Sequence, residues 1–169
     1  MEQTIVNLQE YSPEWKKQFD LEKEQLVTVL MPQVIAIEHI GSTSVEGIMA
    51  KPIIDILVGM KDLREVHDFV QPLKKLGYEY VPKQELKDRR FFRKGEWGKG
   101  TVHLHICEFG SSEWIEKILF RDYLRSHTEA AKEYEEMKKK LAFSYKYERQ
   151  TYTKKKEPFI KRIIEKART

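Results

Sequence analysis

The sequence predicts a mixed α/β (α+β) fold, in which a small mixed β-sheet is flanked by helices and the last third of the chain is helical. The run Ile-Ile-Asp-Ile-Leu-Val at residues 53–58 is almost wholly apolar and β-branched, as expected of a buried strand. Residues 34–40 form a second candidate strand, and a Gly-Ser-Thr-Ser turn at residues 41–44 separates the two. Apolar residues recur at helical spacing before and after this pair, which indicates helices packed on a sheet.

The composition indicates one compact domain covering residues 1–169. The chain has 31 basic and 27 acidic residues, a net charge of +4 and a mean hydropathy of -0.63. Its longest apolar stretch is too short to span a bilayer and its start lacks the pattern of a secretion signal, so we expect a cytoplasmic protein that does not enter membranes. The single cysteine, Cys107, agrees with a reducing compartment and is expected to be buried and inert.

The distribution of charged residues along the sequence indicates which kinds of partner to expect. Acidic residues are interspersed among the basic ones, which favours an anionic small ligand and makes nucleic acid an unlikely partner. The pattern does not predict an oligomeric state.

Helix signals surround the two central strands. Ser12 followed by Pro13 is a typical helix start, and this helix is expected to end at Pro32 with four apolar residues on its inner face: Trp15, Phe19, Leu26 and Leu30. Asp62, with Glu65 three residues later, forms a capping box that predicts another helix ending at Gly77.

The second half of the chain alternates strands and helices before becoming helical. Strands are predicted at residues 78–81, 89–94 and 101–108, with a hairpin turn at 95–100. Ser112 is expected to cap the next helix, a long helix should cover residues 129–147, and the last helix should start near Thr153. The inner stripe of the long helix should comprise Ala130, Tyr134, Met137, Leu141 and Tyr145, while Lys138 to Lys140 and Lys154 to Lys156 should be solvated.

The turn formed by Gly41, Ser42, Thr43 and Ser44 is a candidate phosphate site. Glycine tolerates dihedral angles that other residues avoid, and the hydroxyl groups can cap a short helix. Such a turn leaves backbone N–H groups unpaired beside the positive end of a helix dipole. We expect it to face an open cleft.

Asp55 is the first candidate for chemistry, because it is the one acid in its apolar strand. Period-two geometry places it on the face opposite Ile54 and Ile56. A carboxylate there could hold a divalent metal that in turn holds a phosphate. The alternative is a carboxylate that caps nearby backbone or pairs with Lys51 or Arg90.

His103 and His105 are the second candidate, since residues two apart on a strand share a face. With Asp55 they would form a compact mixed nitrogen and oxygen site that suits zinc, manganese or nickel better than magnesium. Histidines that only form hydrogen bonds are the alternative. His39 could join the site or pack in the core.

Basic side chains from separate elements form the third constellation, because the planar fork of arginine suits phosphate. Its members are Lys51, Arg89, Arg90, Arg93, Arg121, Arg125 and Lys156. The aromatic residues Phe91, Phe92 and Trp97 lie near the basic segment and could stack on a base or pack between strands.

Four separated words resemble the GrpB family. They are His-Ile-Gly-Ser-Thr-Ser-Val at residues 39–45, Ala-Lys-Pro-Ile-Ile-Asp-Ile at 50–56, His-Leu-His at 103–105 and Phe-Arg-Asp-Tyr-Leu-Arg at 120–125. The resemblance covers the chain from about Tyr11 to the C-terminal helix and implies a nucleotidyltransferase-like fold with the strands of Asp55 and the histidines side by side. Arg121 lies in the last word, and its alternative role is a structural pair with Glu116 or Asp122.

The resemblance implies a function more coarsely than a fold. We expect a protein that binds a nucleotide or another phosphorylated small molecule, with possible metal-assisted nucleotidyl or phosphoryl transfer in which Asp55, His103 and His105 are the catalytic and metal-binding residues. The active enzymes of the superfamily carry a second acid two residues after the first, where this chain has Leu57. The alternative is therefore a non-catalytic binding or interaction module.

Overall fold

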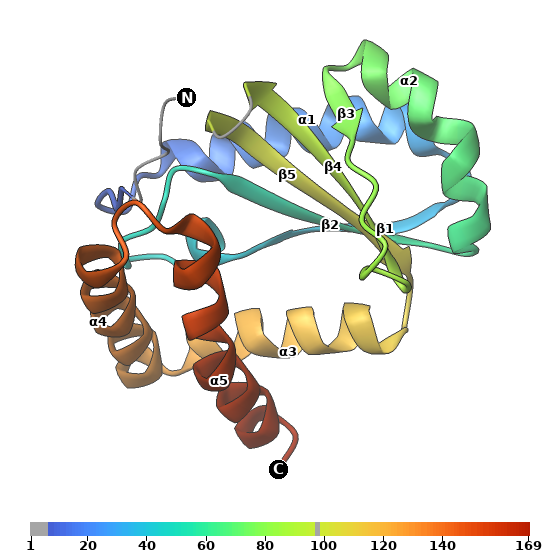
Figure 1. Cartoon of the computed structure of the whole chain (residues 1–169). Helices are drawn as coiled ribbons and strands as arrows, with labels where there is room; N and C mark the ends of the chain where they lie inside the picture. The colour runs from blue at the N-terminus through green and yellow to red at the C-terminus, as the bar shows by residue number, and fades with distance from the viewer. Residues whose placement is uncertain (1–6, 97–98) are drawn as a thin grey trace.

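The computed structural model describes residues 7–96 and 99–169 and contains a five-stranded mixed sheet (Figure 1). The strands are β1 (Val34–Ile40), β2 (Ile54–Met60), β3 (Tyr78–Tyr80), β4 (Arg89–Glu96) and β5 (Lys99–Glu108), in the spatial order β1-β2-β5-β4-β3. Only β2 and β5 run parallel among these pairs; the other neighbours are antiparallel. The predicted mixed sheet is confirmed. The tip of the predicted hairpin turn, at residues 97–98, lies outside the described residues.

The helices are α1 (Glu14–Leu30), α2 (Val70–Lys75), α3 (Ser112–Ser126), α4 (Thr128–Ser144) and α5 (Arg149–Ala167). Two 3-10 segments, η1 (Ser42–Ser44) and η2 (Leu63–Phe69), connect them to the strands. Figure 1 shows α1 and α3 on opposite sides of the sheet, with α4 and α5 at the end of α3. Within the described residues, no helix has the length and apolar character that a membrane span requires.

The face of the sheet toward α1 holds the main core. Alternate residues of β2 and β5, including Ile56, Val58, Leu104 and Ile106, are fully buried in one cluster with the inner stripe of α1. That stripe is the predicted set Trp15, Phe19, Leu26 and Leu30. Period-two geometry explains why these strand residues face α1 together.

The opposite face has a smaller apolar cluster made of Ile40, Leu57, Cys107 and Trp114. A third cluster joins the loop after η1 to the C-terminal helices through Val45, Ile48, Leu124, Tyr134 and Phe159. These helices therefore pack on the turn of residues 41–44 and its following loop as much as on the sheet.

Two side chains of α4 hold that loop through the backbone of Met49. Glu135 Oε2 accepts a hydrogen bond from Met49 N at 2.5 Å, and Lys138 Nζ donates to Met49 O at 2.6 Å. Lys138 is only 1% exposed, so the prediction that Lys138 is solvated is wrong. Its ammonium lies 4.8 Å from the ring centre of Tyr134, where a cation–π contact lowers the cost of burial.

Several helix boundaries differ from the predicted ones. Residues 63–75 form η2 followed by α2, and the Asp62 side chain accepts from Arg64 N rather than completing the expected box with Glu65. Ser111, not Ser112, caps α3 through a hydrogen bond from Trp114 N. The helix α4 ends at Ser144, and α5 begins at Arg149, four residues before the predicted start.

Candidate functional site

The turn between β1 and β2 is built around Gly41. Gly41 has a φ of 75°, in the region that favours glycine, and a Cβ atom placed there would lie 2.5 Å from Asp55 Oδ2. The position thus needs glycine for its backbone angle and for the close approach of the Asp55 carboxylate. The segment after it, η1, has only three residues, so the predicted contribution of a helix dipole is small.

The hydroxyl groups of the turn divide into structural and available ones. Thr43 Oγ1 donates to Ile53 O at 3.1 Å and Ser44 Oγ donates to Gly41 O at 2.5 Å, so both stabilise the turn itself. Ser42 is half-buried, and within the described residues its hydroxyl has no hydrogen-bond partner. Ser42 is therefore the hydroxyl of this turn that a ligand can reach.

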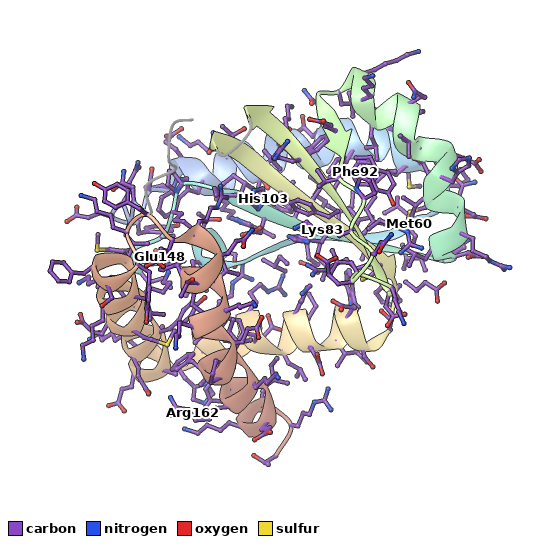
Figure 2. All side chains as sticks on the ribbon, in the orientation of Figure 1. Met60, Lys83, Phe92, His103, Glu148 and Arg162 are labelled. Carbon is purple, nitrogen blue, oxygen red and sulfur yellow. The ribbon has the colours of Figure 1, made fainter. Side chains whose placement is uncertain are left out.

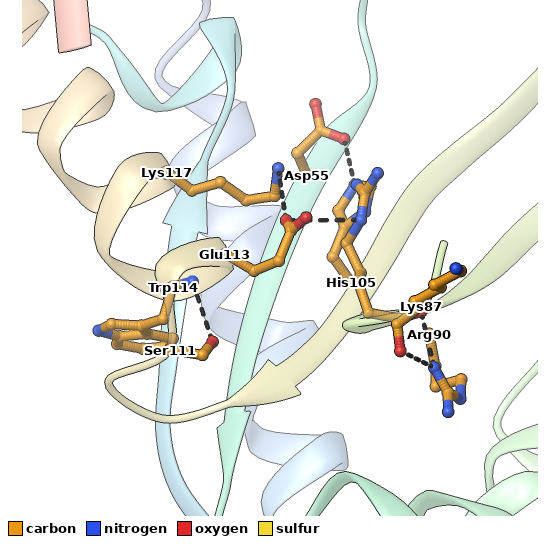
Figure 3. Close-up of polar contacts among 9 residues, drawn as sticks. Asp55, Lys87, Arg90, His105, Ser111, Glu113, Trp114 and Lys117 are labelled. Atoms are coloured by element: carbon orange, nitrogen blue, oxygen red, sulfur yellow. Dashed lines mark hydrogen bonds and ion pairs between the residues drawn. The ribbon is translucent and has the colours of Figure 1, made fainter. Parts of the chain in front are cut away.

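Asp55 and the two histidines do come together, because β2 and β5 pair in parallel with Asp55 opposite His103. Asp55 Oδ1 lies 3.4 Å from His105 Nε2 and 3.7 Å from His103 Nδ1. Figure 2 places His103 on the sheet, and Figure 3 shows Asp55 beside His105 with Glu113 and Lys117 of α3 close by. The ring of Phe91 on β4 borders both histidines, at 5.2 and 5.3 Å between ring centres.

Arg89 determines which nitrogen of His105 carries the proton. Arg89 Nη1 lies 2.8 Å from His105 Nδ1, and a guanidinium can only donate, so Nδ1 accepts. The neutral ring then carries its proton on Nε2 and donates it toward Asp55. Arg89 is in turn held by Glu113, at 3.8 Å, and Glu113 also pairs with Lys117 at 3.4 Å.

Burial and these contacts set the charge states. Burial lowers the pKa of His105 below its usual value and lowers that of His103 to about 4, so both rings are neutral at physiological pH. Burial alone would raise the pKa of Asp55, but the hydrogen bond from His105 and the nearby positive groups hold that pKa below its ordinary value. Asp55 is therefore an ionised carboxylate between neutral rings.

A metal centre formed by all three residues does not fit this arrangement. Among the described residues, no group of three or more His, Cys, Asp or Glu side chains is arranged to hold a metal ion. The lone pair of His105 is directed at Arg89, and its other nitrogen carries a proton, so this ring has no free ligand atom. Asp55 and His103 each keep a possible ligand atom that has no hydrogen-bond partner among the described residues.

Basic side chains gather on the α5 side of Asp55. The ammonium groups of Lys51 and Lys156 lie 5.0 and 4.8 Å from the ring centre of Tyr152, which is fully buried. Burial and the charges of Lys156 and Arg149 lower the pKa of Lys51 to about 7. The negative charge of Asp55 opposes the lowering of the pKa of both Lys51 and Arg149.

This group was only partly predicted. Lys51 and Lys156 belong to the predicted basic constellation, whereas Arg149 and Tyr152 were not predicted to join it and Lys138 was predicted to be solvated. The hydroxyl of Tyr152 is buried without a hydrogen-bond partner among the described residues. An aromatic residue three or four positions from two basic ones in a helix was the available clue.

Three predicted phosphate-binding arginines lie elsewhere. Arg121 is buried, and its guanidinium donates to Glu38 Oε2 at 2.9 Å, to His39 O at 3.1 Å and to Asp122. The Asp122 pair is the structural alternative considered for Arg121, while Glu116 contacts Arg168 instead.

Arg125 and Arg90 also turn away from Asp55. Arg125 Nε donates to Ser44 O at 3.0 Å and so supports the turn from the α3 side. Arg90 donates to the backbone oxygens of Lys87 and Arg89, and strand alternation places it on the face opposite Phe91 and the histidines. The anion-binding potential near Asp55 thus rests on lysine and α5 rather than on these arginines.

Comparison with known proteins agrees with this fold. A family model described as GrpB protein matches residues 5–166. The chain is 40% identical over 163 residues to the glutamate-rich protein GrpB of Alkalihalophilus pseudofirmus, covering 94% of each chain. It is also 40% identical over 158 residues to the UPF0157 protein YqkA of Bacillus subtilis, of which it spans only 46%.

Solved structures extend the comparison. A crystal structure of the conserved protein GrpB from Enterococcus faecalis matches with a TM-score of 0.89 and 38% identity, covering 95% of this chain and 96% of that one. The Cid1 poly(U) polymerase matches with a TM-score of 0.51 and 18% identity over 76% of this chain and 40% of its own. This second likeness shows a nucleotidyltransferase fold alone.

Proposed function

The chain belongs to the GrpB family, and we propose that it binds a nucleotide or another phosphorylated small molecule beside Asp55, between the turn of residues 41–44 and the basic residues of α5. Cid1, which shares the fold, is a poly(U) polymerase, so the fold is compatible with a nucleotide ligand.

The observation that carries the proposal is the uncompensated positive charge around Tyr152. Lys51 and Lys156 share one aromatic ring, and within the described part of the chain neither has a carboxylate within ion-pair distance. Burial is the main cause of the lowered pKa of Lys51, and the charges of Lys156 and Arg149 lower it further, so the free protein disfavours the protonated form of Lys51. An anionic ligand would supply the missing countercharge, and a phosphate group has the required charge and acceptor oxygens.

Ser42 and Asp55 lie on the other side of the proposed site and would orient the ligand. Ser42 offers a free hydroxyl, and Asp55 offers a fixed carboxylate whose position is set by Gly41 and by the Nε2–H of His105. Side chains fixed in this way do not have to reorganise when a ligand binds.

Asp55 would be the residue that holds a divalent ion, and such an ion would neutralise the negative charge of a phosphate group. One carboxylate is enough for an ion that phosphate oxygens also hold, and magnesium or manganese binds in this way. A site formed by Asp55, His103 and His105 together would favour zinc, manganese or nickel over magnesium, but His105 donates a proton and does not offer a ligand atom. The protein contribution would be Asp55, with His103 as the nearest further donor.

A second candidate function, a binding module without catalysis, is favoured by Leu57. Its side chain is fully buried among Cys107 and Trp114, so this position provides no second carboxylate to the site. Phosphoryl or nucleotidyl transfer would have to proceed with Asp55 as the one carboxylate that β2 provides. Release of phosphate or pyrophosphate from a bound nucleotide separates the two candidates.

Calorimetric titration tests the binding site. ATP, UTP and inorganic tripolyphosphate are titrated into the wild type and into Lys51→Met and Asp55→Asn, with Lys61→Met as the matched control on an exposed loop lysine. We expect the Lys51 change to weaken binding about tenfold or more, as for the loss of a charge-assisted contact, and the control to leave binding unchanged. Equal affinity in all four proteins, or no binding by the wild type, would remove the proposed site.

A further inference from the structure

A cavity lies beside the turn of residues 41–44, and Asp55 is not part of its wall. It has a volume of about 730 Å³ and lies between α1, the end of β1, the loop after η1 and the junction of α3 with α4. Thr43 and Ser44 are part of its wall, whereas Asp55, His103 and His105 are not. Small-molecule sites commonly have volumes of roughly 300–1,000 Å³, so this cavity is large enough for a ligand.

The inner wall of the cavity is apolar. Phe19 of α1, Val45 and Ile48 of the loop, and Leu124 of α3 are all buried and line it. Such a surface would accommodate an aromatic or aliphatic group of a ligand.

His39 adds one buried hydrogen-bond acceptor. The hydroxyl proton of Thr43 goes to Ile53 O, which can only accept, so His39 Nε2 must donate to Thr43 Oγ1 across their 3.0 Å separation. The proton of the neutral ring is then on Nε2, and Nδ1 keeps a lone pair with no hydrogen-bond partner among the described residues. His39 is 94% buried and lines the cavity, with one ring face stacked on Phe19.

The environment keeps this acceptor unprotonated. Burial lowers the pKa of His39 to about 4, and the charges of Arg125 and Arg121 act in the same direction, while Asp55 and Asp20 oppose them. At neutral pH the cavity therefore presents a lone pair to a ligand N–H or O–H group.

The rim of the cavity has three cationic side chains and two carboxylates that are not in ion pairs among the described residues. Lys16, Arg125 and Lys132 line the cavity, and none of them pairs with a carboxylate in the described part of the chain. Of the three acidic lining residues, Glu38 is already paired with Arg121, which leaves Asp20 and Glu46. A singly charged anion fits this balance better than a polyphosphate, which the two remaining carboxylates would repel.

We propose that this cavity is a separate site for a small amphipathic acid, whose apolar part packs on Phe19 and Leu124, whose N–H or O–H group donates to His39 Nδ1 and whose anionic group contacts Arg125 and Lys132. The site goes beyond the proposed nucleotide site, since it uses neither Asp55 nor the basic residues of α5. It shares only the wall of the turn, through Thr43 and Ser44.

The test uses 8-anilinonaphthalene-1-sulfonate, a fluorescent probe with two aromatic groups, one N–H and one sulfonate. We expect saturable binding with one probe per chain, and binding about tenfold weaker in Lys132→Glu and in Arg125→Gln. Lys140→Glu is the matched control, because it makes the same charge change on an exposed lysine of the same helix. Probe binding to the control should equal that of the wild type.

Two further measurements separate this site from the nucleotide site and from loosened structure. Asp55→Asn should leave probe affinity unchanged, and the 15N resonance of His39 Nδ1 should shift when the probe binds. A thermal melting curve of each variant shows whether it is folded, so that probe fluorescence caused by unfolded protein is not taken for binding to the cavity. Three results would each overturn the proposal. The first is equal probe affinity in Lys132→Glu, Lys140→Glu and the wild type, and the second is displacement of the probe by ATP together with loss of probe binding in Asp55→Asn. The third is a His39 Nδ1 resonance that does not shift when the probe binds.

Discussion

The face of the sheet that packs on α1 is lined almost entirely by apolar side chains, whereas the face toward α3 carries Asp55, two histidines and Arg89 in the same strands. Leu104 and His105 are sequence neighbours on β5, yet one is buried in the main core and the other donates to a carboxylate. Apolar burial on the α1 face therefore supplies most of the folding free energy, which allows the α3 face to hold polar groups whose burial is unfavourable.

A matched pair of leucines tests this division most strongly. Leu104 and Leu57 are both fully buried, on opposite faces of the sheet. Replacing either with Ala should lower the free energy of unfolding by about 2–5 kcal/mol, because each change leaves a cavity. Only Leu57→Ala should also weaken nucleotide binding, since Leu57 pairs with His105 in the strand register. Denaturant unfolding and calorimetry measure the two effects, and equal loss of binding in both variants would contradict the division.

Arg121 tests whether a buried cation on the α3 side is structural. Arg121→Ala should cost about 2 kcal/mol of stability, below the value for a fully buried pair because the partner side chain of Glu38 is 41% exposed. Nucleotide affinity should not change, since the guanidinium is already used by Glu38, Asp122 and a backbone oxygen. Weaker binding at unchanged stability would return Arg121 to the phosphate site.

Gly41 and Gly47 form a matched pair of glycines in the loop between β1 and β2. Gly47→Ala should cost about 1–2 kcal/mol because Gly47 has a positive φ, and Gly41→Ala should cost more, because its added Cβ would also lie 2.5 Å from Asp55 Oδ2. A Cβ at Gly41 meets the Asp55 carboxylate, while one at Gly47 has no neighbour within 4 Å. Only Gly41→Ala should therefore weaken nucleotide binding as well, by at least about tenfold. Calorimetry on both variants decides, and equal affinities would show that the carboxylate is not part of the site.

The lowered pKa of Lys51 predicts that both the stability of the protein and its ligand binding depend on pH. Its pKa is about 7 in the folded chain against an ordinary 10.5, so between these values the unfolded chain binds more protons and stability should rise with pH. Lys51→Met should flatten this rise without removing it, because burial also lowers the pKa of Lys138 to about 7. Phosphate beside Lys51 should favour its protonated form, so binding at pH 8 should take up protons. Calorimetry in two buffers of different ionisation enthalpy measures that uptake; zero uptake would contradict the contact.

His105 provides the smallest expected effect. His105→Gln retains an N–H donor for Asp55, so nucleotide affinity should stay within a factor of about two to five of the wild type. Manganese, zinc and magnesium titrations should also be unchanged by this substitution, but weakened by Asp55→Asn. Loss of metal binding in His105→Gln would show that His105 is a ligand, and the 15N spectrum of the wild-type ring checks the proton on Nε2 directly.

Sequence reasoning predicted the fold well where periodicity was strong. The strand at residues 34–40 has the expected bounds, the four inner residues of α1 are buried, and Asp55 meets His103 and His105 because the strand faces follow period two. The expectation that these two strands are neighbours came from the family resemblance, since local pattern does not specify which strands pair, and their parallel direction is seen only in the structure.

The misses involve contacts between distant segments. Lys138 lies in a run of three lysines that reads as solvated, yet a backbone oxygen 89 residues away accepts its proton. Arg89 commits the lone pair of His105, which removed one expected metal ligand, and no local spacing in the sequence indicates that contact. Arg121 fitted a family word completely, but two of its partners, Glu38 and His39, come from β1 and only Asp122 lies in the same word.

The attachment of Met49 to α4 limits how this chain can be shortened. Its amide and carbonyl are satisfied by side chains of Glu135 and Lys138, not by neighbouring backbone. A fragment ending after α3 would keep every strand, yet leave these two groups without partners, at a cost of about 1–3 kcal/mol for each one that stays buried. Minimal fragments, split reporters and domain fusions based on this protein should therefore retain α4, and the segment after α3 should be regarded as an internal brace of the loop that follows the Gly-Ser turn.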